Sequence, residues 1–284
     1  MTLRLVVASM LLLAGCVTTS ARSEAGRRGN CAWQVCLRQE NTPSGRVFRV
    51  DNGEPVPVTV GLTFRSLQNL RPPPEDTVRR VVAPHSSAVI SLPAIERGRP
   101  VGAAIAISID LGSSETEPDP EFVYAVPFGG SARRPLIQGY GGEGTHLGSM
   151  RFSFDFGMPR GTPVLAAREG VVLYSQDGFT EGRADPRLLE RANLVVVAHR
   201  DGTMASYGHL APGLAVAVGD SVREGQLLGL SGRTGFAGEP HLHFHVGLRM
   251  LGEPGRTIPI RMRNEDGEVI DLAEGALIEP ARQR

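Results

Sequence analysis

The most constraining feature of this sequence is a short segment near its C-terminal end in which histidines alternate with apolar residues. The segment reads Pro240, His241, Leu242, His243, Phe244, His245, Val246. Because successive side chains of a β-strand point to opposite faces, this alternation predicts a strand with one imidazole face and one core face. Imidazole is a good zinc ligand, but a catalytic zinc ion usually needs three protein ligands and a water. The rest of the chain must therefore supply further ligands.

The composition excludes several classes of function. With 284 residues, the chain is long enough for one large or two ordinary domains. Its 30 basic and 30 acidic residues cancel, so the net charge offers no argument for a nucleic-acid partner, and we predict none. Every basic residue is an arginine, which excludes a Schiff-base lysine, a P-loop and a lipoyl or biotinyl carrier module.

Residues 1–16 predict a lipoprotein signal peptide. Arg4 precedes an apolar run over residues 5–13 that is too short to span a bilayer. The sequence Leu-Ala-Gly-Cys that ends at Cys16 resembles a bacterial lipobox, in which this cysteine is lipidated after cleavage; an ordinary cleaved signal is the alternative. Val17 rather than Asp follows, which by the sorting rule of Gram-negative lipoproteins implies a periplasmic protein anchored by lipid to the outer membrane.

Residues 17–30 are polar and predict a flexible tether. Two cysteines, Cys31 and Cys36, follow it directly. In an oxidising compartment, with Cys16 consumed by lipid, we expect these two to form a short-loop disulfide. The alternative is half of a zinc knuckle, although no second cysteine or histidine pair lies nearby in the sequence.

Residues 31–128 predict a β-sandwich, roughly immunoglobulin-like. Apolar residues alternate strictly over residues 56–64 and 105–111, and turn segments rich in proline, glycine and aspartate separate these and other short runs. Short strands at this spacing are typical of two packed sheets. Because the segment contains no catalytic pattern, we expect it to be a spacer or a module that docks the substrate or an envelope protein partner.

A change in composition at residues 128–131 predicts the domain boundary, so residues 129–284 form the second domain. Two candidate ligands stand near its beginning. His146 ends a glycine-rich loop, and Asp155 lies between Phe154 and Phe156, which the alternation directs into a core. An aspartate oxygen is an ordinary third zinc ligand beside two imidazoles.

From about residue 138 to residue 246 the sequence resembles the lysostaphin/LytM-type zinc metallopeptidases. An ordered set of motifs carries the resemblance: His146 with Asp155, then Tyr207, Gly208, His209, Leu210, then Pro240, His241, Leu242, His243, Phe244, with family-like phrases at 161–164, 222–226 and 231–235. The resemblance implies a duplicated-hybrid-motif antiparallel β-sheet for the second domain. Together with the sandwich, it makes the predicted fold class all-β.

The resemblance also implies a role for each matched residue. One zinc ion per chain would be held by His146, Asp155 and His243, with His241 and His209 as the catalytic histidines and Tyr140 as a helper in oxyanion binding. Alternate residues of a strand lie about 6–7 Å apart, so His241 is placed to take a proton from the water, a role worth about 10²–10⁴ in rate. His209 would give a proton to the leaving amine or stabilise the oxyanion. The alternative for Tyr140 is an aromatic side chain that packs on the surface.

The sequence departs from the family pattern at two places. Eight residues separate His146 from Asp155, which is a longer spacing than in many members of the family. This longer spacing resembles that of one subgroup of the family. His245 occupies a position where many members have glutamate; it either orients a ligand, contacts substrate, or is a buried histidine with its hydrogen bonds satisfied. His199, which precedes an Asp-Gly turn, is expected to be structural.

The resemblance and the export signal together predict a zinc metalloendopeptidase that hydrolyses the peptide cross-links of peptidoglycan in cell-wall remodelling. No residues recognisable as a substrate pocket contribute to this prediction. The alternative is a catalytically inactive, envelope-anchored regulator that activates a separate cell-wall hydrolase. Such relatives usually lack a ligand or a catalytic histidine, whereas all five positions are occupied here, which favours the enzyme.

Overall fold

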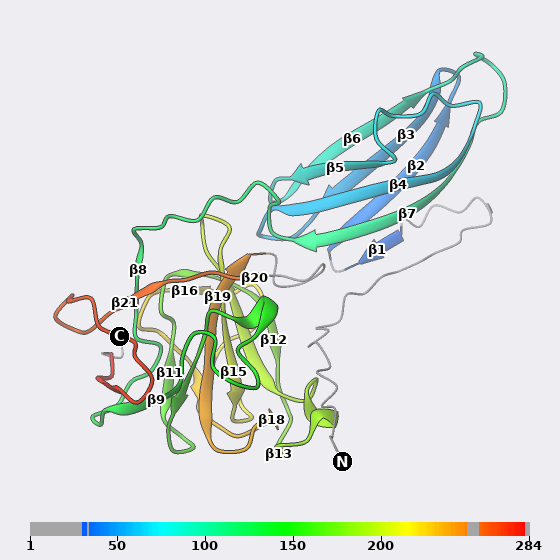
Figure 1. Ribbon diagram of the computed structural model, residues 1–284. Coiled ribbons are helices and arrows are strands. Elements are labelled where there is room, and N and C mark those ends of the chain that lie inside the picture. The colour runs from blue at the N-terminus through cyan, green and yellow to red at the C-terminus, as the bar shows by residue number, and fades with distance from the viewer. Residues whose placement is uncertain (1–29, 33, 249–255, 282–284) are drawn as a thin grey trace.

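The computed structural model describes residues 30–32, 34–248 and 256–281, and the regular secondary structure of these residues is almost entirely β-strand (Figure 1). Within these ranges the helices are two short 3-10 turns, η1 (Gly148–Met150) and η2 (Pro186–Leu188). The all-β class predicted from the sequence is therefore confirmed. No helix in the described ranges has the length and apolar character needed to cross a bilayer. The predicted signal peptide, the lipidation of Cys16 and nearly all of the predicted tether lie outside the described residues.

The N-terminal part of the chain folds into two antiparallel sheets. One has the strand order β1-β2-β3-β6, and the other has the order β5-β4-β7. The strands are β1 (Asn30–Ala32), β2 (Val35–Thr42), β3 (Gly45–Asn52), β4 (Val58–Gln68), β5 (Thr77–Val82), β6 (Ser86–Pro93) and β7 (Gly102–Leu111). Cys31 of β1 stands opposite Cys36 of β2, and a disulfide joins them as the sequence predicted.

Side chains from both N-terminal sheets meet in one hydrophobic core. Phe48 and Val50 of the first sheet and Val60 and Leu62 of the second are fully buried in it. The alternation in residues 56–64 is thus the pattern of a strand with one face in this core. Two sheets that share one core in this way are arranged as in a β-sandwich.

A larger sheet organises the second part of the chain. Its strand order is β16-β12-β14-β15-β19-β10-β9-β22, and β20 pairs with β19. The strands are β9 (Arg134–Gln138), β10 (Ser153–Gly157), β12 (Gly170–Gln176), β14 (Asn193–Ala198), β15 (Met204–Leu210), β16 (Ser221–Val222), β19 (His241–Leu248), β20 (Arg256–Thr257) and β22 (Leu277–Ile278). Three further pairs complete the domain: β8 (Val123–Ala125) with β21 (Arg261–Arg263), β11 (Pro163–Leu165) with β17 (Leu227–Leu230), and β13 (Gly182–Arg183) with β18 (Gly235–Phe236).

One face of the larger sheet packs on the core of the second domain. Leu242 and Phe244 of β19, Phe154 and Phe156 of β10, and Tyr207 of β15 are buried there. The intervening residues of β19, including the three histidines, therefore lie on the opposite face. The strand predicted from the histidine alternation is present, with the two faces that the sequence predicted.

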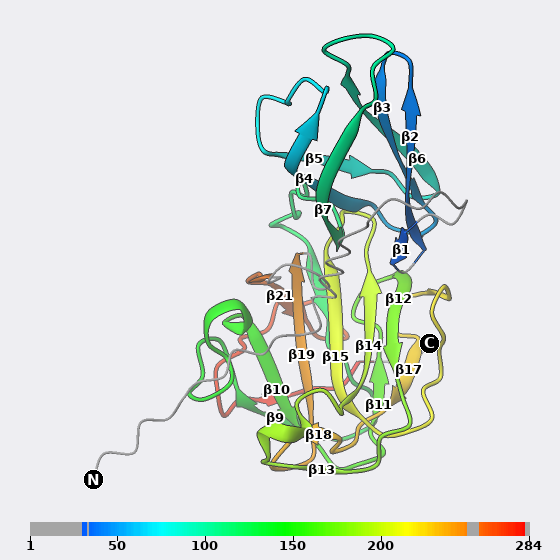
Figure 2. The ribbon, with the colours of Figure 1, turned by 90° about the vertical axis from the view of Figure 1, so that its right-hand side faces the viewer.

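The sandwich packs against the histidine-bearing face of the larger sheet. Leu173, Val196, Ala198 and Met204 lie on that face and belong to the same hydrophobic cluster as the sandwich core. Figures 1 and 2 show the sandwich at one end of the larger sheet. Burial of these side chains joins the two domains by apolar packing as well as by the chain that connects them.

The second domain begins a few residues before the boundary predicted at residue 128. β8 pairs with β21, and Tyr124, Val126 and Phe128 all belong to the second core. The glycines after Phe128 mark a turn inside the domain rather than a linker, since the Gly129 amide donates to the Pro163 carbonyl. Composition shows a turn but does not distinguish a turn within a domain from one between domains.

His199 is buried at the junction between β8 and the sheet, as expected for a structural histidine. Its Nδ1 donates to the Glu169 carbonyl at 2.8 Å, and its ring packs edge-on against Tyr124. Nearby, Arg168 forms an ion pair with Asp201 at 2.7 Å. Burial lowers the pKa of His199 to about 4, so the imidazole is neutral in the folded protein at neutral pH.

We expect the buried His199 to make the protein less stable in mild acid. The unfolded chain takes up a proton at this residue below about pH 6.5, whereas the folded chain does so only near pH 4. The free energy of unfolding should therefore fall by about 2 kcal/mol between pH 7 and pH 5 because of this residue alone. Urea unfolding in EDTA at several pH values measures this effect for the protein and for His199→Asn. Between pH 7 and pH 5 the free energy of unfolding should fall more steeply for the protein than for the variant. The same dependence on pH in both would contradict the prediction.

Candidate metal centre

The loop after β9 holds His146 with one ring nitrogen directed into the site. Its Nδ1 donates to the Gly139 carbonyl at 2.8 Å, which leaves Nε2 as the nitrogen with a free lone pair. That Nε2 atom is buried, makes no hydrogen bond within the described residues, and lies 3.3 Å from Oδ1 of Asp155. The lone pair of this buried nitrogen accepts no hydrogen bond from the described residues and lies beside a carboxylate. The nitrogen is therefore a suitable metal ligand.

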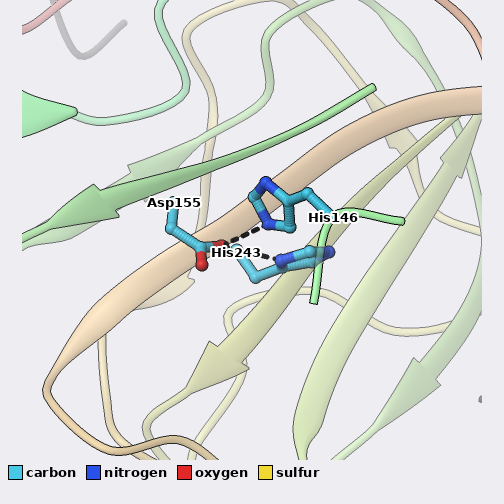
Figure 3. Close-up of side chains that lie close together, drawn as sticks. All are labelled: His146, Asp155 and His243. Atoms are coloured by element: carbon cyan, nitrogen blue, oxygen red, sulfur yellow. Dashed lines mark hydrogen bonds and ion pairs between the residues drawn. The ribbon is translucent and has the colours of Figure 1, made fainter. Parts of the chain in front are cut away.

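Antiparallel pairing brings the other two predicted ligands together. Asp155 of β10 stands directly opposite His243 of β19 in the sheet register. Nδ1 of His243 lies 2.7 Å from Oδ1 of Asp155, and Figure 3 shows both side chains converging with His146. The ligand atoms of the three residues all lie within 4.8 Å of one another.

The chemistry of these three residues fits zinc. Burial alone would raise the pKa of Asp155, but the electrostatic attraction of the neighbouring His243 and the close approach of His146 outweigh it and hold the pKa well below its usual range. The carboxylate is thus ionised and available as an anionic ligand. Two imidazoles and one carboxylate form a common ligand set of catalytic zinc sites, which keep a further position open.

His241 lies beside the three ligands with its ring fixed by the backbone. Its Nδ1 donates to the Glu239 carbonyl at 2.8 Å, and its Nε2 lies 3.8 Å from Oδ1 of Asp155. Burial lowers the pKa of His241, so the ring is neutral at neutral pH and Nε2 can accept a proton. This is the geometry required of a general base next to the ligand cluster.

His209 reaches the site through an irregularity in β15. Gly208 pairs with Leu194 and Leu210 pairs with Asn193, so His209 is an extra residue in the ladder, a β-bulge. Its φ of +62° lies in the left-handed region that non-glycine residues rarely adopt. Without the bulge, strand alternation would direct this side chain toward the core, on the same face as Tyr207.

The bulge places the His209 ring against the other imidazoles. Its centroid lies 4.6 Å from that of His241 and 6.0 Å from that of His243. Its Nδ1 donates to the Thr234 carbonyl at 2.7 Å, so Nε2 is again the free nitrogen. Burial and the nearby His241 lower the pKa of His209 to about 3. The structure thus brings together all five positions that the resemblance implied.

Tyr140 is hydrogen-bonded through its hydroxyl to the C-terminal segment of the chain. Its hydroxyl accepts a hydrogen bond from the Ile260 amide at 2.7 Å and donates to the Ile260 carbonyl at 3.2 Å. The ring packs at a tilt against Phe154, which lies on the core side of β10, away from Asp155. Burial raises the pKa of Tyr140 to about 12, so the hydroxyl stays protonated. Tyr140 therefore ties the loop that carries His146 to the C-terminal segment.

We expect Tyr140→Phe to affect stability more than catalysis. The substitution removes two hydrogen bonds to the Ile260 backbone, which should lower the free energy of unfolding by about 1 kcal/mol. The kcat for peptide hydrolysis should change by less than about threefold, because removal of a true oxyanion donor costs about 10²–10³ in kcat. Urea unfolding and steady-state kinetics measure the two effects, and a loss of kcat in that larger range would return Tyr140 to the catalytic site.

His245 contacts His243, one of the three candidate metal ligands, directly. Its Nδ1 lies 3.0 Å from Nε2 of His243, and the residue is buried between Ser153 and Ser206 of the two neighbouring strands. Its own Nε2 makes no hydrogen bond within the described residues. Of the roles left open from the sequence, contact with a ligand is the one that the structure supports.

Two buried polar residues beside His209 escaped the sequence analysis. The side chains of Asn193 and Thr234 both donate to the Leu210 carbonyl, directly after the bulge residue. Thr234 stands in the family-like phrase 231–235, but neither its hydroxyl nor its carbonyl suggests a role until the tertiary contacts are known.

Comparison with known proteins identifies the family of the second domain. The pattern of Peptidase family M23 matches residues 149–254. The cell division protein DipM of Caulobacter vibrioides is 34% identical over 114 residues, which cover 40% of this chain and 17% of DipM. The peptidoglycan DD-endopeptidase ShyA of Vibrio cholerae is 38% identical over 95 residues, which cover 34% of this chain and 20% of ShyA. The chain therefore spans about a fifth of the length of these relatives.

Among solved structures, the catalytic domain of lysostaphin from Staphylococcus simulans aligns with 45% of this chain and 81% of that domain, at 27% identity and a TM-score of 0.28. The family match includes Asp155, His209, His241 and His243, and His146 stands just before it. The part of the chain that builds this metal centre is therefore a peptidase family M23 domain.

Proposed function

We propose that this chain is a zinc metalloendopeptidase that hydrolyses peptide cross-links of peptidoglycan during cell-wall remodelling. The observation that carries the proposal is the convergence of a three-ligand cluster with two histidines, His209 and His241, whose Nε2 atoms are free. A regulator that only binds a partner needs neither the ligands nor the additional imidazoles. Relatives named peptidoglycan DD-endopeptidase and glycyl-glycine endopeptidase support this class of substrate.

Each residue of the site has a distinct task in this proposal. His146, Asp155 and His243 would hold the zinc ion. When bound there, zinc acts as a Lewis acid that polarises a peptide carbonyl and lowers the pKa of water. His241, neutral and with Nε2 free, takes the proton of the attacking water. His209, whose ring lies beside that of His241, would take up this proton at Nε2 and pass it to the leaving amine.

The proposed location follows from the N-terminal sequence. A lipid on Cys16 and a polar tether would hold the domains near the periplasmic side of the outer membrane, within reach of the cell wall. The sandwich would then position the peptidase domain or bind an envelope protein partner.

Metal content and hydrolysis measured on one preparation test the proposal. The chain without its signal peptide should contain about one zinc ion per molecule. It should cleave cross-linked muropeptides, lose this activity in EDTA, and regain it when zinc is added. Zinc without cleavage of any cross-linked muropeptide would favour the inactive regulator, and a folded protein that binds no zinc would overturn the site itself.

A further inference from the structure

We propose that Asn193 and Thr234 are positioning residues that hold His209 in its strained conformation beside the metal ligands. The inference rests on the proposed function, in which His209 takes part in proton transfer. It assigns to two residues outside the ligand cluster the task of setting where that imidazole lies and which of its nitrogens carries the proton.

The conformation of His209 needs support from its surroundings. A non-glycine residue with positive φ is strained and persists only where neighbouring structure enforces it. His209 has a φ of +62°, and its bulge interrupts the ladder between β14 and β15. The carbonyl of the next residue, Leu210, consequently accepts hydrogen bonds from side chains.

Asn193 and Thr234 supply those side-chain donors. The Thr234 hydroxyl donates to the Leu210 carbonyl at 2.8 Å, and Nδ2 of Asn193 donates to the same carbonyl at 3.1 Å. The Asn193 amide donates to the Thr234 hydroxyl at 2.9 Å, which links the two residues. Both are buried, with exposed fractions of 0% and 2%, so these bonds form away from competing water.

Thr234 acts on both the backbone and the ring of the bulge. Its hydroxyl holds the Leu210 carbonyl, and its own carbonyl accepts the hydrogen bond from Nδ1 of His209 at 2.7 Å. A carbonyl can only accept, so this contact fixes the proton on Nδ1 and leaves Nε2 as the base. One residue thus couples the strained backbone to the orientation and the tautomer of the imidazole.

Asn193 extends the same network to the segment between β12 and β14. Its Nδ2 also donates to the Phe179 carbonyl at 2.8 Å, and its Oδ1 accepts from the Phe179 amide at 2.9 Å. The side chain therefore has its hydrogen-bonding capacity satisfied by the backbone of Phe179 and of Leu210. Such a satisfied, buried arrangement permits little movement of the backbone at residues 209–210.

The test replaces the Thr234 hydroxyl with a methyl group of similar size. In the full zinc-loaded chain, Thr234→Val should lower kcat for muropeptide cleavage by about 10–100-fold, because small displacements of a catalytic group cost that much. The KM and the zinc content should stay within about twofold of the wild-type values, because the ligands are not touched. Thr234→Ser keeps the hydroxyl and should restore most of the activity.

Two further readouts separate positioning from a merely structural role. In a double-mutant cycle, Thr234→Val should have no further effect on kcat when His209→Ala is already present. In ¹⁵N NMR spectra of the zinc-free chain, the His209 side chain should show the Nδ1–H tautomer, and Thr234→Val should yield a mixture of tautomers. Thermal unfolding of each variant establishes that it is folded.

The inference is overturned if Thr234→Val retains wild-type kcat and a pure Nδ1–H signal. It is also overturned if the effect on kcat is the same with and without His209, because the threonine would then act on the fold as a whole. If the wild-type chain cleaves no muropeptide, the proposed function fails, and the NMR comparison still decides whether Thr234 positions the ring.

Discussion

Replacing His243 with alanine is expected to abolish both zinc binding and peptide hydrolysis. His243 lies opposite Asp155 in the sheet, and its Nδ1 is within 2.7 Å of the carboxylate oxygen. Without it, two ligands remain, fewer than the three that hold catalytic zinc in proteins. Loss of the ion removes several kcal/mol of transition-state stabilisation, which is roughly a 10³-fold or larger fall in kcat/KM.

Elemental analysis after dialysis, together with muropeptide cleavage, measures this result. His85→Asn serves as the matched control, since His85 is exposed in a loop of the sandwich and asparagine tolerates its positive φ of 49°. The control should keep wild-type zinc content and activity. Stoichiometric zinc of unchanged affinity in His243→Ala would show that the ligand set proposed here is wrong.

Replacing His241 with alanine is expected to separate zinc binding from catalysis. The Nε2 atom of His241 lies 3.8 Å from Oδ1 of Asp155, whereas the corresponding distance for His146 is 3.3 Å. If His241 is the base and not a ligand, the variant keeps its zinc and loses about 10²–10⁴ in kcat. The KM should change little, because the residue acts on the proton of the water rather than on the bound substrate.

Zinc titration and steady-state kinetics on the same preparation decide this prediction. The informative comparison is with His243→Ala, which should lose zinc as well as activity. If His241→Ala also released zinc, His241 would be a ligand, and the division of roles between the two histidines of β19 would have to be reversed. If His241→Ala kept both zinc and wild-type kcat, another residue would have to be the base.

Local periodicity in the sequence predicted the strand that carries the site, because a β-strand imposes a period of two on its side chains. His241 and His243 lie on one face of β19, and Leu242 and Phe244 lie in the core. The same reasoning placed Asp155 opposite the core side of β10. These predictions depend only on which face of a strand a residue occupies, which the order of polar and apolar residues reveals.

The position of His209 could not be derived from that periodicity. Regular alternation in β15 places it on the core side with Tyr207, and the family resemblance alone suggested otherwise. The bulge that turns it toward the ligands depends on hydrogen bonds from Asn193 and Thr234. These residues come from other segments of the chain, so no local pattern around His209 contains this information.

Tyr140 makes a contact with a distant segment that no local pattern in the sequence predicts. Its motif position suggested a catalytic hydroxyl, but Ile260, 120 residues later in the chain, holds that hydroxyl at both its donor and its acceptor sites. A contact between distant segments also affects where the second domain begins. β8, which precedes the boundary suggested by composition at residue 128, joins the second domain because it pairs with β21.

The sequence by itself determined the all-β class, the two faces of β19 and the set of metal-binding residue types, because each follows from short-range order along a strand or from residue chemistry. Only the tertiary structure decided the register that sets Asp155 against His243, the bulge that presents His209, and the packing of the sandwich on the histidine-bearing face. The physical reason is that register, bulges and domain contacts are fixed by hydrogen bonds and apolar burial between segments far apart in the chain.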